Sequence, residues 1–216
     1  MTSTDDELAE GQLMDFGSLR IAYDDQVLLP RPWTEMQSQW AAELAPQVPP
    51  GKILELCAGA GQIGLLAASL TGRSLVAVDA DATACRFAER NAREAGLDAH
   101  VEIRNVPLDR SCAPGERFPV IIADPPWVRA AETDRFPQDP LTAIDGGPDG
   151  LDVARSCLRV IDAHLAPDGI ALLQLGDVDQ VDTLRSEAPT DLQLTEVRAE
   201  GDRGVVVLVR RSDSSG

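Results

Sequence analysis

The 216-residue sequence predicts a single α/β domain built on a doubly wound sheet. Short apolar runs alternate with helical segments along the chain, which is the βαβ order of a parallel sheet with helices on both faces. A glycine-rich turn joins the first of these runs to a helix, and residues 200–203 separate the last two runs with a hairpin signal. We therefore expect a mostly parallel sheet with an antiparallel C-terminal edge strand.

Strand and helix signals alternate between the two ends of the chain. Strands are expected at residues 52–57, 74–78, 100–104, 119–123, 169–175, 192–199 and 204–210. Helices are expected at residues 62–70, 82–95, 151–165 and 178–186. The second helix stops at Gly96, a favourable C-terminal cap. About the first 12 residues and the tail from Ser212 to Gly216 are expected to be frayed.

Composition limits the partners and the location that we expect. With 36 acidic and 19 basic residues the net charge is −17, which repels polyanions and makes nucleic acid a disfavoured partner. No apolar stretch reaches the length of a membrane span, and the acidic first residues lack the apolar core of a signal peptide. The expected location is the cytoplasm, without a membrane partner. The four cysteines have no C-x-x-C spacing, so we expect reduced, buried thiols and no metal site.

A glycine-rich turn after the first strand is a candidate ligand site. The strand runs into residues 55–61, Glu-Leu-Cys-Ala-Gly-Ala-Gly, and an apolar helix follows. Glycines let the backbone approach a ligand, and a helix N-terminus supplies N–H groups. Asp79 ends the second strand, where a carboxylate can accept hydrogen bonds from both hydroxyls of a ribose. Because Gly59, Gly61 and Gly64 also fit Gly-x-Gly-x-x-Gly, a dinucleotide and a purely structural turn are alternatives.

A second candidate site is Asp124-Pro125-Pro126-Trp127, directly after the apolar run 120–123. The prolines fix φ and lack N–H donors, so backbone carbonyls there can face a cleft. Asp124 adds an accepting side chain, and Trp127 adds a flat face. Such a group can hold a planar N–H₂ from two directions, which suits an enzyme that methylates nitrogen. The structural alternative is a proline-rich strand exit with Trp127 in the core.

Together these motifs resemble those of class I S-adenosylmethionine-dependent methyltransferases. Glu55-x-x-x-Gly59-x-Gly61 is similar to the first motif of that family, with Cys57 in place of the usual glycine. Residues 124–127 are similar to the Asp/Asn/Ser-Pro-Pro-aromatic motif of N-methyltransferases. The resemblance implies a Rossmann-like class I methyltransferase fold, S-adenosyl-L-methionine as cofactor, and transfer to nitrogen.

The resemblance also implies roles for individual positions. Residues 58–61 would pass beneath the methionine part of the cofactor, Glu55 would organise this turn, and Asp79 would bind the ribose. The residues expected to bind the cofactor are Glu55, Ala58, Gly59, Ala60, Gly61, Asp79, Asn105, Val106 and Asp124. Asn105 or Val106 would flank the adenine. The residues expected at the acceptor are Asp124, Pro125, Pro126 and Trp127.

Two further segments resemble the protein-glutamine N5-methyltransferases of the HemK/PrmC family. They are residues 27–35, Val-Leu-Leu-Pro-Arg-Pro-Trp-Thr-Glu, and residues 141–151, Leu-Thr-Ala-Ile-Asp-Gly-Gly-Pro-Asp-Gly-Leu. The resemblance implies an N-terminal extension or hairpin over residues 1–50 that covers the cofactor site. A methyltransferase domain would follow over residues 51–211, and a disordered tail over residues 212–216. The helical substrate domain of that family is not expected in the stretch before Lys52.

The acceptor remains open at this stage. The release-factor enzymes of that family have Asn and Tyr where this chain has Asp124 and Trp127, and an ionised Asp can only accept hydrogen bonds. We expect methylation of a protein side-chain amide or another nitrogen. A small-molecule methyltransferase, an adenine N6-methyltransferase and a non-catalytic subunit are the alternatives. A nucleic-acid enzyme would need a basic strip, for which the candidates are Arg20, Arg31, Arg129 and Arg135. The oligomeric state and any activating partner are not predicted.

Overall fold

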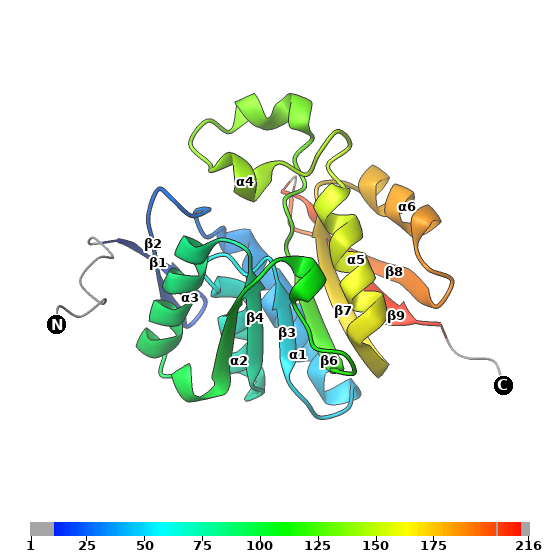
Figure 1. The fold of residues 1–216 in the computed structure, drawn as a ribbon, viewed down its shortest axis with the longest axis horizontal. Coiled ribbons are helices and arrows are strands. Elements are labelled where there is room, and N and C mark those ends of the chain that lie inside the picture. The colour runs from blue at the N-terminus through cyan, green and yellow to red at the C-terminus, as the bar shows by residue number, and fades with distance from the viewer. Residues whose placement is uncertain (1–10, 202, 213–216) are drawn as a thin grey trace.

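A computed structural model describes residues 11–201 and 203–212, and its centre is a seven-stranded sheet with the order β5-β4-β3-β6-β7-β9-β8 (Figure 1). The strands are β3 (Ile53–Leu56), β4 (Leu75–Asp79), β5 (Val101–Asn105), β6 (Phe118–Ala123), β7 (Leu165–Leu175), β8 (Leu192–Ala199) and β9 (Val205–Arg211). Neighbouring strands from β5 to β7 are parallel, whereas β9 runs antiparallel to both β7 and β8. The predicted fold class is therefore confirmed. The antiparallel strand, β9, lies between β7 and β8, and β8 forms the edge of the sheet.

Helices cover both faces of this sheet. The hydrophobic core on one face includes residues of α1 (Glu35–Leu44), α2 (Gln62–Thr71) and α3 (Ala82–Glu94). The core on the other face includes residues of α5 (Asp152–His164) and α6 (Val178–Glu187). The strands alternate between the two cores: Ile53 packs on the first face and Leu54 on the second. Because successive side chains of a strand point to opposite faces of the sheet, a strand that helices cover on both faces is a continuous apolar run in the sequence.

Most expected elements agree with the structure to within a few residues, and three details differ. The expected frayed start is wrong at Gln12, which begins a hairpin of β1 (Gln12–Phe16) and β2 (Leu19–Tyr23). The expected frayed tail is wrong at Ser212, whose N–H donates to the Asp191 carbonyl at 2.9 Å. The other residues of both predicted ends lie outside the part of the chain that is described. Helix α1, for which no helix was expected, lies within the predicted N-terminal extension.

Asn91 on α3 holds the β1–β2 hairpin against the rest of the domain. Its side chain is fully buried, and its Oδ1 accepts the N–H of Ala22 at 2.7 Å. Its Nδ2 donates to the Ala22 carbonyl at 3.0 Å and to the Ala60 carbonyl at 2.9 Å. One amide side chain thus joins the hairpin to the glycine-rich turn, and all of its bonds replace hydration that burial removes.

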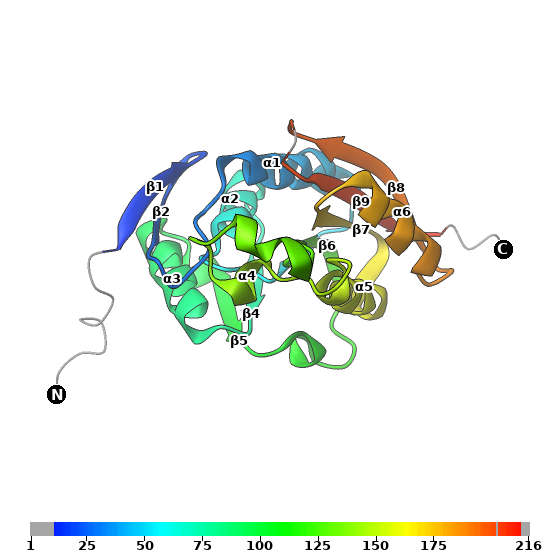
Figure 2. The same ribbon diagram turned by 90° about the horizontal axis from the view of Figure 1, so that it is seen from above.

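The carboxyl ends of β3, β4, β6 and β7 meet at one edge of the sheet, and both candidate sites follow these strands. Figure 2, which looks down on this edge, shows α4 (Leu141–Ile144) lying over it. In open α/β sheets ligands bind at this edge, outside the carboxyl ends of the strands. Across the described residues, no helix has both the length and the apolar character needed to span a membrane.

All four cysteines are free thiols, as expected. Cys85 and Cys157 are buried, whereas Cys57 and Cys112 are partly exposed, which corrects the expectation that all four are buried. The sulfur atoms of Cys57 and Cys157 lie 3.9 Å apart, too far for a disulfide.

Candidate functional site

The glycine-rich turn between β3 and α2 depends on left-handed backbone conformations. Gly59 and Gly61 have φ values of +54° and +82°, and Cys57 has a φ of +58°. A left-handed conformation costs a non-glycine residue roughly 1–2 kcal/mol, so a glycine at position 57 would relieve strain. A Cβ added at Gly59 would meet nothing within 4 Å. The turn therefore presents open space at Gly59, where a ligand can approach the backbone.

Two carboxyl groups hold this turn from below. Oε1 of Glu55 accepts the N–H of Gly64 at 2.8 Å, in the first turn of α2. Oδ2 of Asp79 accepts the N–H of Gly59 at 2.8 Å, and its Oδ1 accepts the N–H of Asp81 at 2.9 Å. Glu55 thus anchors the start of the helix, while Asp79 at the end of β4 fixes the turn itself.

Three acidic side chains meet near this turn, and burial shifts the pKa of each upward. Glu55 is 2% exposed, and burial raises its pKa to about 8. The N–H bond from Gly64 lowers that pKa, and the charges of Asp124 and Asp79 raise it further. Burial also raises the pKa of Asp79 and brings that of Asp124 to about 7. Carboxyl groups whose pKa values are shifted in this way occur at functional sites more often than on the rest of a protein surface.

A cavity of about 450 Å³, called here the larger cavity, opens above the turn. Four of the residues expected to bind a cofactor line it: Gly59, Asp79, Val106 and Asp124. The others lie beside it: Ala58, Ala60 and Gly61 belong to the turn, Glu55 lies beneath it, and Asn105 donates from Nδ2 to the Asp79 carbonyl at 3.1 Å. Sequence reasoning missed Gln26, Gln62 and Thr142, which also line the cavity.

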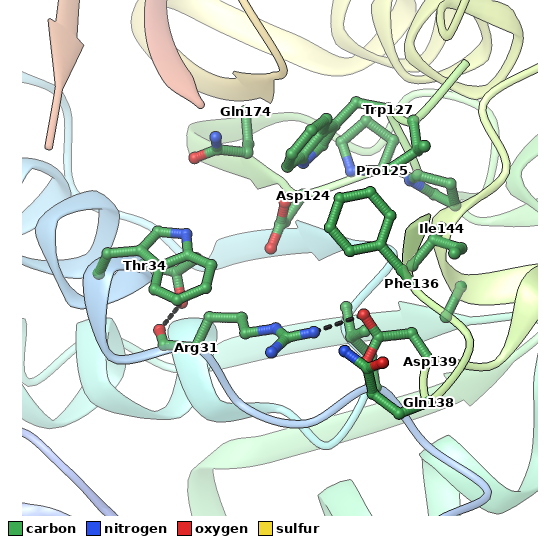
Figure 3. A pocket seen from close by; sticks show the side chains of 15 residues that line it. Arg31, Thr34, Asp124, Pro125, Trp127, Phe136, Gln138, Asp139, Ile144 and Gln174 are labelled. Carbon is green, nitrogen blue, oxygen red and sulfur yellow. Dashed lines mark hydrogen bonds and ion pairs between the residues drawn. The ribbon is translucent and has the colours of Figure 1, made fainter. Parts of the chain in front are cut away.

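A second cavity of about 220 Å³, called here the smaller cavity, lies at the Asp124-Pro125-Pro126-Trp127 segment. All four residues of the segment line it, as do Trp33 and Phe136. Figure 3 shows the Asp124 carboxylate pointing into the space beside the rings of Trp127 and Phe136. The aromatic and proline surfaces give the cavity flat, apolar walls, and its charged lining residues are Asp124, Arg31 and Asp139.

The two cavities share a wall. Leu28, Asp124, Pro126 and Ala143 line both of them. A group bound in the larger cavity and a group bound in the smaller cavity would therefore meet beside Asp124. This is the arrangement that a transfer between two bound molecules requires.

The glycine loop 146–150 supports the Asp-Pro-Pro-Trp segment. The N–H of Gly146 donates to the Val128 carbonyl at 2.9 Å, and the N–H of Val128 donates to the Ile144 carbonyl at 3.0 Å. A Cβ on Gly146 would lie 2.7 Å from the Pro126 carbonyl oxygen, a distance that backbone atoms cannot accommodate. The loop thus needs glycine so that its backbone can pack directly on the segment that lines the smaller cavity.

Sequence reasoning also missed Gln180 on α6, which bonds to three parts of the site. Its side chain is 2% exposed, and its Nε2 donates to the carbonyls of Trp127 and Asp149, both at 3.0 Å. Its Oε1 accepts the N–H of Gly176 at 2.7 Å. Gln180 therefore joins the Asp-Pro-Pro-Trp segment to the glycine loop and to the end of β7. A glutamine on a surface helix gives no sequence signal of such a role.

Replacing Gln180 with leucine is expected to lower the free energy of unfolding by about 2–4 kcal/mol, because three partly buried backbone groups lose their partners. Urea denaturation measures the change. The matched control is Gln39→Leu at an exposed position of helix α1, which removes no buried bond. A loss for Gln180→Leu no larger than the loss for Gln39→Leu would contradict the structural role described here.

The sheet order and the position of the two cavities are those of the class I methyltransferase fold. Among solved structures, the hMettl16 catalytic domain superposes with a TM-score of 0.72 at 18% identity, covering 93% of this chain and 77% of that one. A methyltransferase from Pyrococcus furiosus superposes with a TM-score of 0.66 at 18% identity, covering 89% and 88%. At these identities the likeness concerns the fold.

Sequence relatives narrow the class to a family. The model of a family described as conserved hypothetical protein 95 matches residues 31–136. The release factor glutamine methyltransferase of Deinococcus radiodurans is 31% identical over 192 residues, which are 87% of this chain and 67% of that protein. The ribosomal protein uL3 glutamine methyltransferase of Bradyrhizobium diazoefficiens is 34% identical over 167 residues, 75% of this chain and 51% of that protein. The chain belongs to this family of protein glutamine methyltransferases.

The predicted resemblance to the glutamine methyltransferases is thereby confirmed. The aligned region nevertheless spans only part of the relatives: 51% of the Bradyrhizobium protein and 55% of the release factor glutamine methyltransferase of Koribacter versatilis, which is 33% identical over 156 residues.

Proposed function

We propose that this chain transfers a methyl group from S-adenosyl-L-methionine to the nitrogen of a protein side-chain amide. The observation that carries the proposal is the shared wall at Asp124, where the larger and the smaller cavity meet. Membership of the glutamine methyltransferase family supports the amide as acceptor. In this proposal residues 51–211 form the methyltransferase domain, and the segment before them contributes Leu28 to both cavities.

The residues around the larger cavity fit S-adenosyl-L-methionine. Gln62 lines the cavity, and its Oε1 is a buried acceptor without a partner among the described residues. An ammonium group such as that of the methionine part would satisfy this oxygen, because buried polar atoms are normally paired. Gly59 leaves open space beside the turn, and Asp79 can accept from ribose hydroxyls while it keeps its backbone bonds. Val106 offers an apolar surface for the adenine.

When bound, this cofactor supplies a methyl group activated by its sulfonium. Asp124 and the Pro125 carbonyl would accept the two N–H bonds of the acceptor, so that the nitrogen lone pair is aimed at the methyl. Trp127 would stack on the planar group and, with Pro126, exclude water. Such a transfer depends mostly on positioning, so the chain needs no general base before it, and the nitrogen loses its proton afterwards.

The charged groups near the smaller cavity give less support to a nucleic-acid acceptor. Arg129 pairs with Asp177 at 2.9 Å, Arg135 with Glu132 at 3.7 Å, and Arg20 with Asp15 at 3.9 Å. Of the four arginines considered for a basic strip, Arg31 alone lines the cavity, and it pairs with Asp139. A protein acceptor of the translation apparatus, as in the names of the relatives, would agree with a cytoplasmic location.

Methyl transfer into a cell extract tests the proposal. The chain is incubated with extract and cofactor labelled on the methyl group, and the products are separated into protein, RNA and small molecules. We expect label in protein, released on acid hydrolysis as methylamine because hydrolysis breaks the amide C–N bond, and none above background when Asp124 is replaced with alanine. Label confined to RNA or to small molecules would contradict the proposed acceptor. Label in no fraction would contradict the proposed activity.

A further inference from the structure

We propose that Arg31 is a specificity-determining residue that binds the oxygen atom next to the acceptor nitrogen. Asp124 would then bind the N–H₂ group of a primary carboxamide, and Arg31 its carbonyl oxygen. This inference rests on the proposed function, because it concerns the acceptor of the same site. It predicts selection of a carboxamide over an amine.

Asp124 alone cannot recognise both halves of a carboxamide. An ionised carboxylate accepts hydrogen bonds and donates none, so it suits the N–H₂ group and repels the carbonyl oxygen. The acceptor must therefore find a donor elsewhere in the smaller cavity, because a carbonyl that is buried without a partner weakens binding.

Two polar side chains that line the smaller cavity each donate one hydrogen bond within the protein, and a third, Gln138, is exposed. The Thr34 hydroxyl donates to the Arg31 carbonyl at 2.8 Å. The Gln174 Nε2 donates to the Leu175 carbonyl at 3.0 Å. Among the described residues of the lining, Arg31 is the single cation, and a guanidinium carries five N–H groups. Arg31 is thus the strongest donor in the cavity.

The guanidinium of Arg31 is held in a fixed place. One of its terminal nitrogens, Nη2, donates to the Asp139 carboxylate, whose side chain is 4% exposed. Its central carbon lies 5.6 Å from the ring centroid of Trp33. Figure 3 shows the guanidinium across the cavity from the Asp124 carboxylate. Because the guanidinium is already paired with Asp139, its remaining N–H groups can donate to a bound oxygen with little further loss of side-chain entropy.

This pair of groups discriminates between nitrogen compounds. A carboxamide presents its N–H bonds and its carbonyl oxygen in one plane and can bind both Asp124 and Arg31. A protonated amine has no acceptor for Arg31, meets its positive charge, and lacks the lone pair that attacks the methyl group. A neutral amine still leaves the guanidinium without the partner that a carboxamide provides.

The test uses the full chain with labelled S-adenosyl-L-methionine and cell extract, and compares wild type with Arg31→Gln, Arg31→Lys and Asp139→Asn. We expect Arg31→Gln to lower the initial rate of labelling by about 10- to 100-fold, as for the loss of a hydrogen bond to a charged group. Arg31→Lys should lose less, because it keeps a cation. The Kd for S-adenosylhomocysteine, measured by calorimetry, should stay near wild type in all variants. Arg135→Gln, at an exposed position outside the cavity, is the matched control.

The outcomes separate the inference from the proposed function. An unchanged rate for Arg31→Gln would overturn the role of Arg31 while the proposed function stands. Wild-type label that stays on an amino acid side chain after acid hydrolysis, as a methylated amine does, would overturn both the amide acceptor and the role of Arg31. An equal loss for Asp139→Asn and Arg31→Gln would also overturn it, since the ion pair would then act only as a structural link. An absence of transfer by wild type would overturn the proposed function and this inference with it.

Discussion

Replacing Asp124 with alanine is expected to lower kcat for methyl transfer by at least about 100-fold, because the acceptor nitrogen loses the group that aims its lone pair. The Kd for S-adenosyl-L-methionine should stay close to that of wild type, since Gly59 and Asp79, which also line the larger cavity, are unchanged. Initial rates with labelled cofactor and calorimetric titration measure the two quantities. Turnover near wild type in this variant would contradict the mechanism.

The isosteric variant Asp124→Asn is the control for this prediction. It keeps one accepting oxygen and should be more active than Asp124→Ala. Burial raises the pKa of Asp124 to about 7, so the carboxylate forms as the pH rises through that value. We therefore expect kcat/KM of wild type to rise between pH 6 and pH 8, and the asparagine variant to lack this rise. The same rise in both variants would assign it to another group.

Replacing Glu55 with glutamine is expected to change the stability of the domain in a pH-dependent way. The pKa of Glu55 is about 8 in the folded chain, against an ordinary value of 4.5. Below pH 4.5 both the folded and the unfolded chain hold the proton. Between these two pKa values the unfolded chain releases it and the folded chain keeps it, so folding stability falls as the pH rises.

Glutamine has no proton to release, so the variant escapes this loss. The free energy of unfolding of Glu55→Gln relative to wild type should therefore increase from pH 5 to pH 8, by an amount on the order of 2–4 kcal/mol. Urea denaturation without cofactor at several pH values measures the difference. The control is Glu89→Gln on helix α3, where the side chain is exposed. A difference for Glu55→Gln that does not vary with pH would show that the carboxyl group is ionised in the folded state.

The fold follows from local signals in the sequence, which explains why it could be predicted. Apolar runs such as Val120–Ala123 alternate faces with a period of two residues, and each is buried between two layers of helices. The glycines of the turn were recognisable because left-handed conformations at Gly59 and Gly61 favour that residue. The glycine-rich turn follows β3 and the segment 124–127 follows β6, so both lie at the same edge of the sheet.

The walls of the smaller cavity could not be predicted in the same way. Phe136 and Gln174 reach the cavity from a loop and from β7, and neither belongs to a recognisable motif. Asn91 and Gln180 look like ordinary polar residues of exposed helix faces, yet both are buried and bonded to distant backbone. Their roles depend on which segments meet in space, and this depends on the complete packing of the sheet.

The position of β9 between β7 and β8 has a consequence for the order in which the protein can fold during synthesis. The glycine-rich turn and strands β3 to β6 precede β7 in the sequence and can pair with one another early. Strand β7 carries Gln174 and gains its outer partner only when β9, beginning at Val205, has left the ribosome. Until then β7 is an open edge that could pair with another chain. The residues that line the larger cavity, the last of which is Val153, are therefore made before β7, whereas the smaller cavity includes Gln174 on a strand that lacks its outer partner until β9 is made.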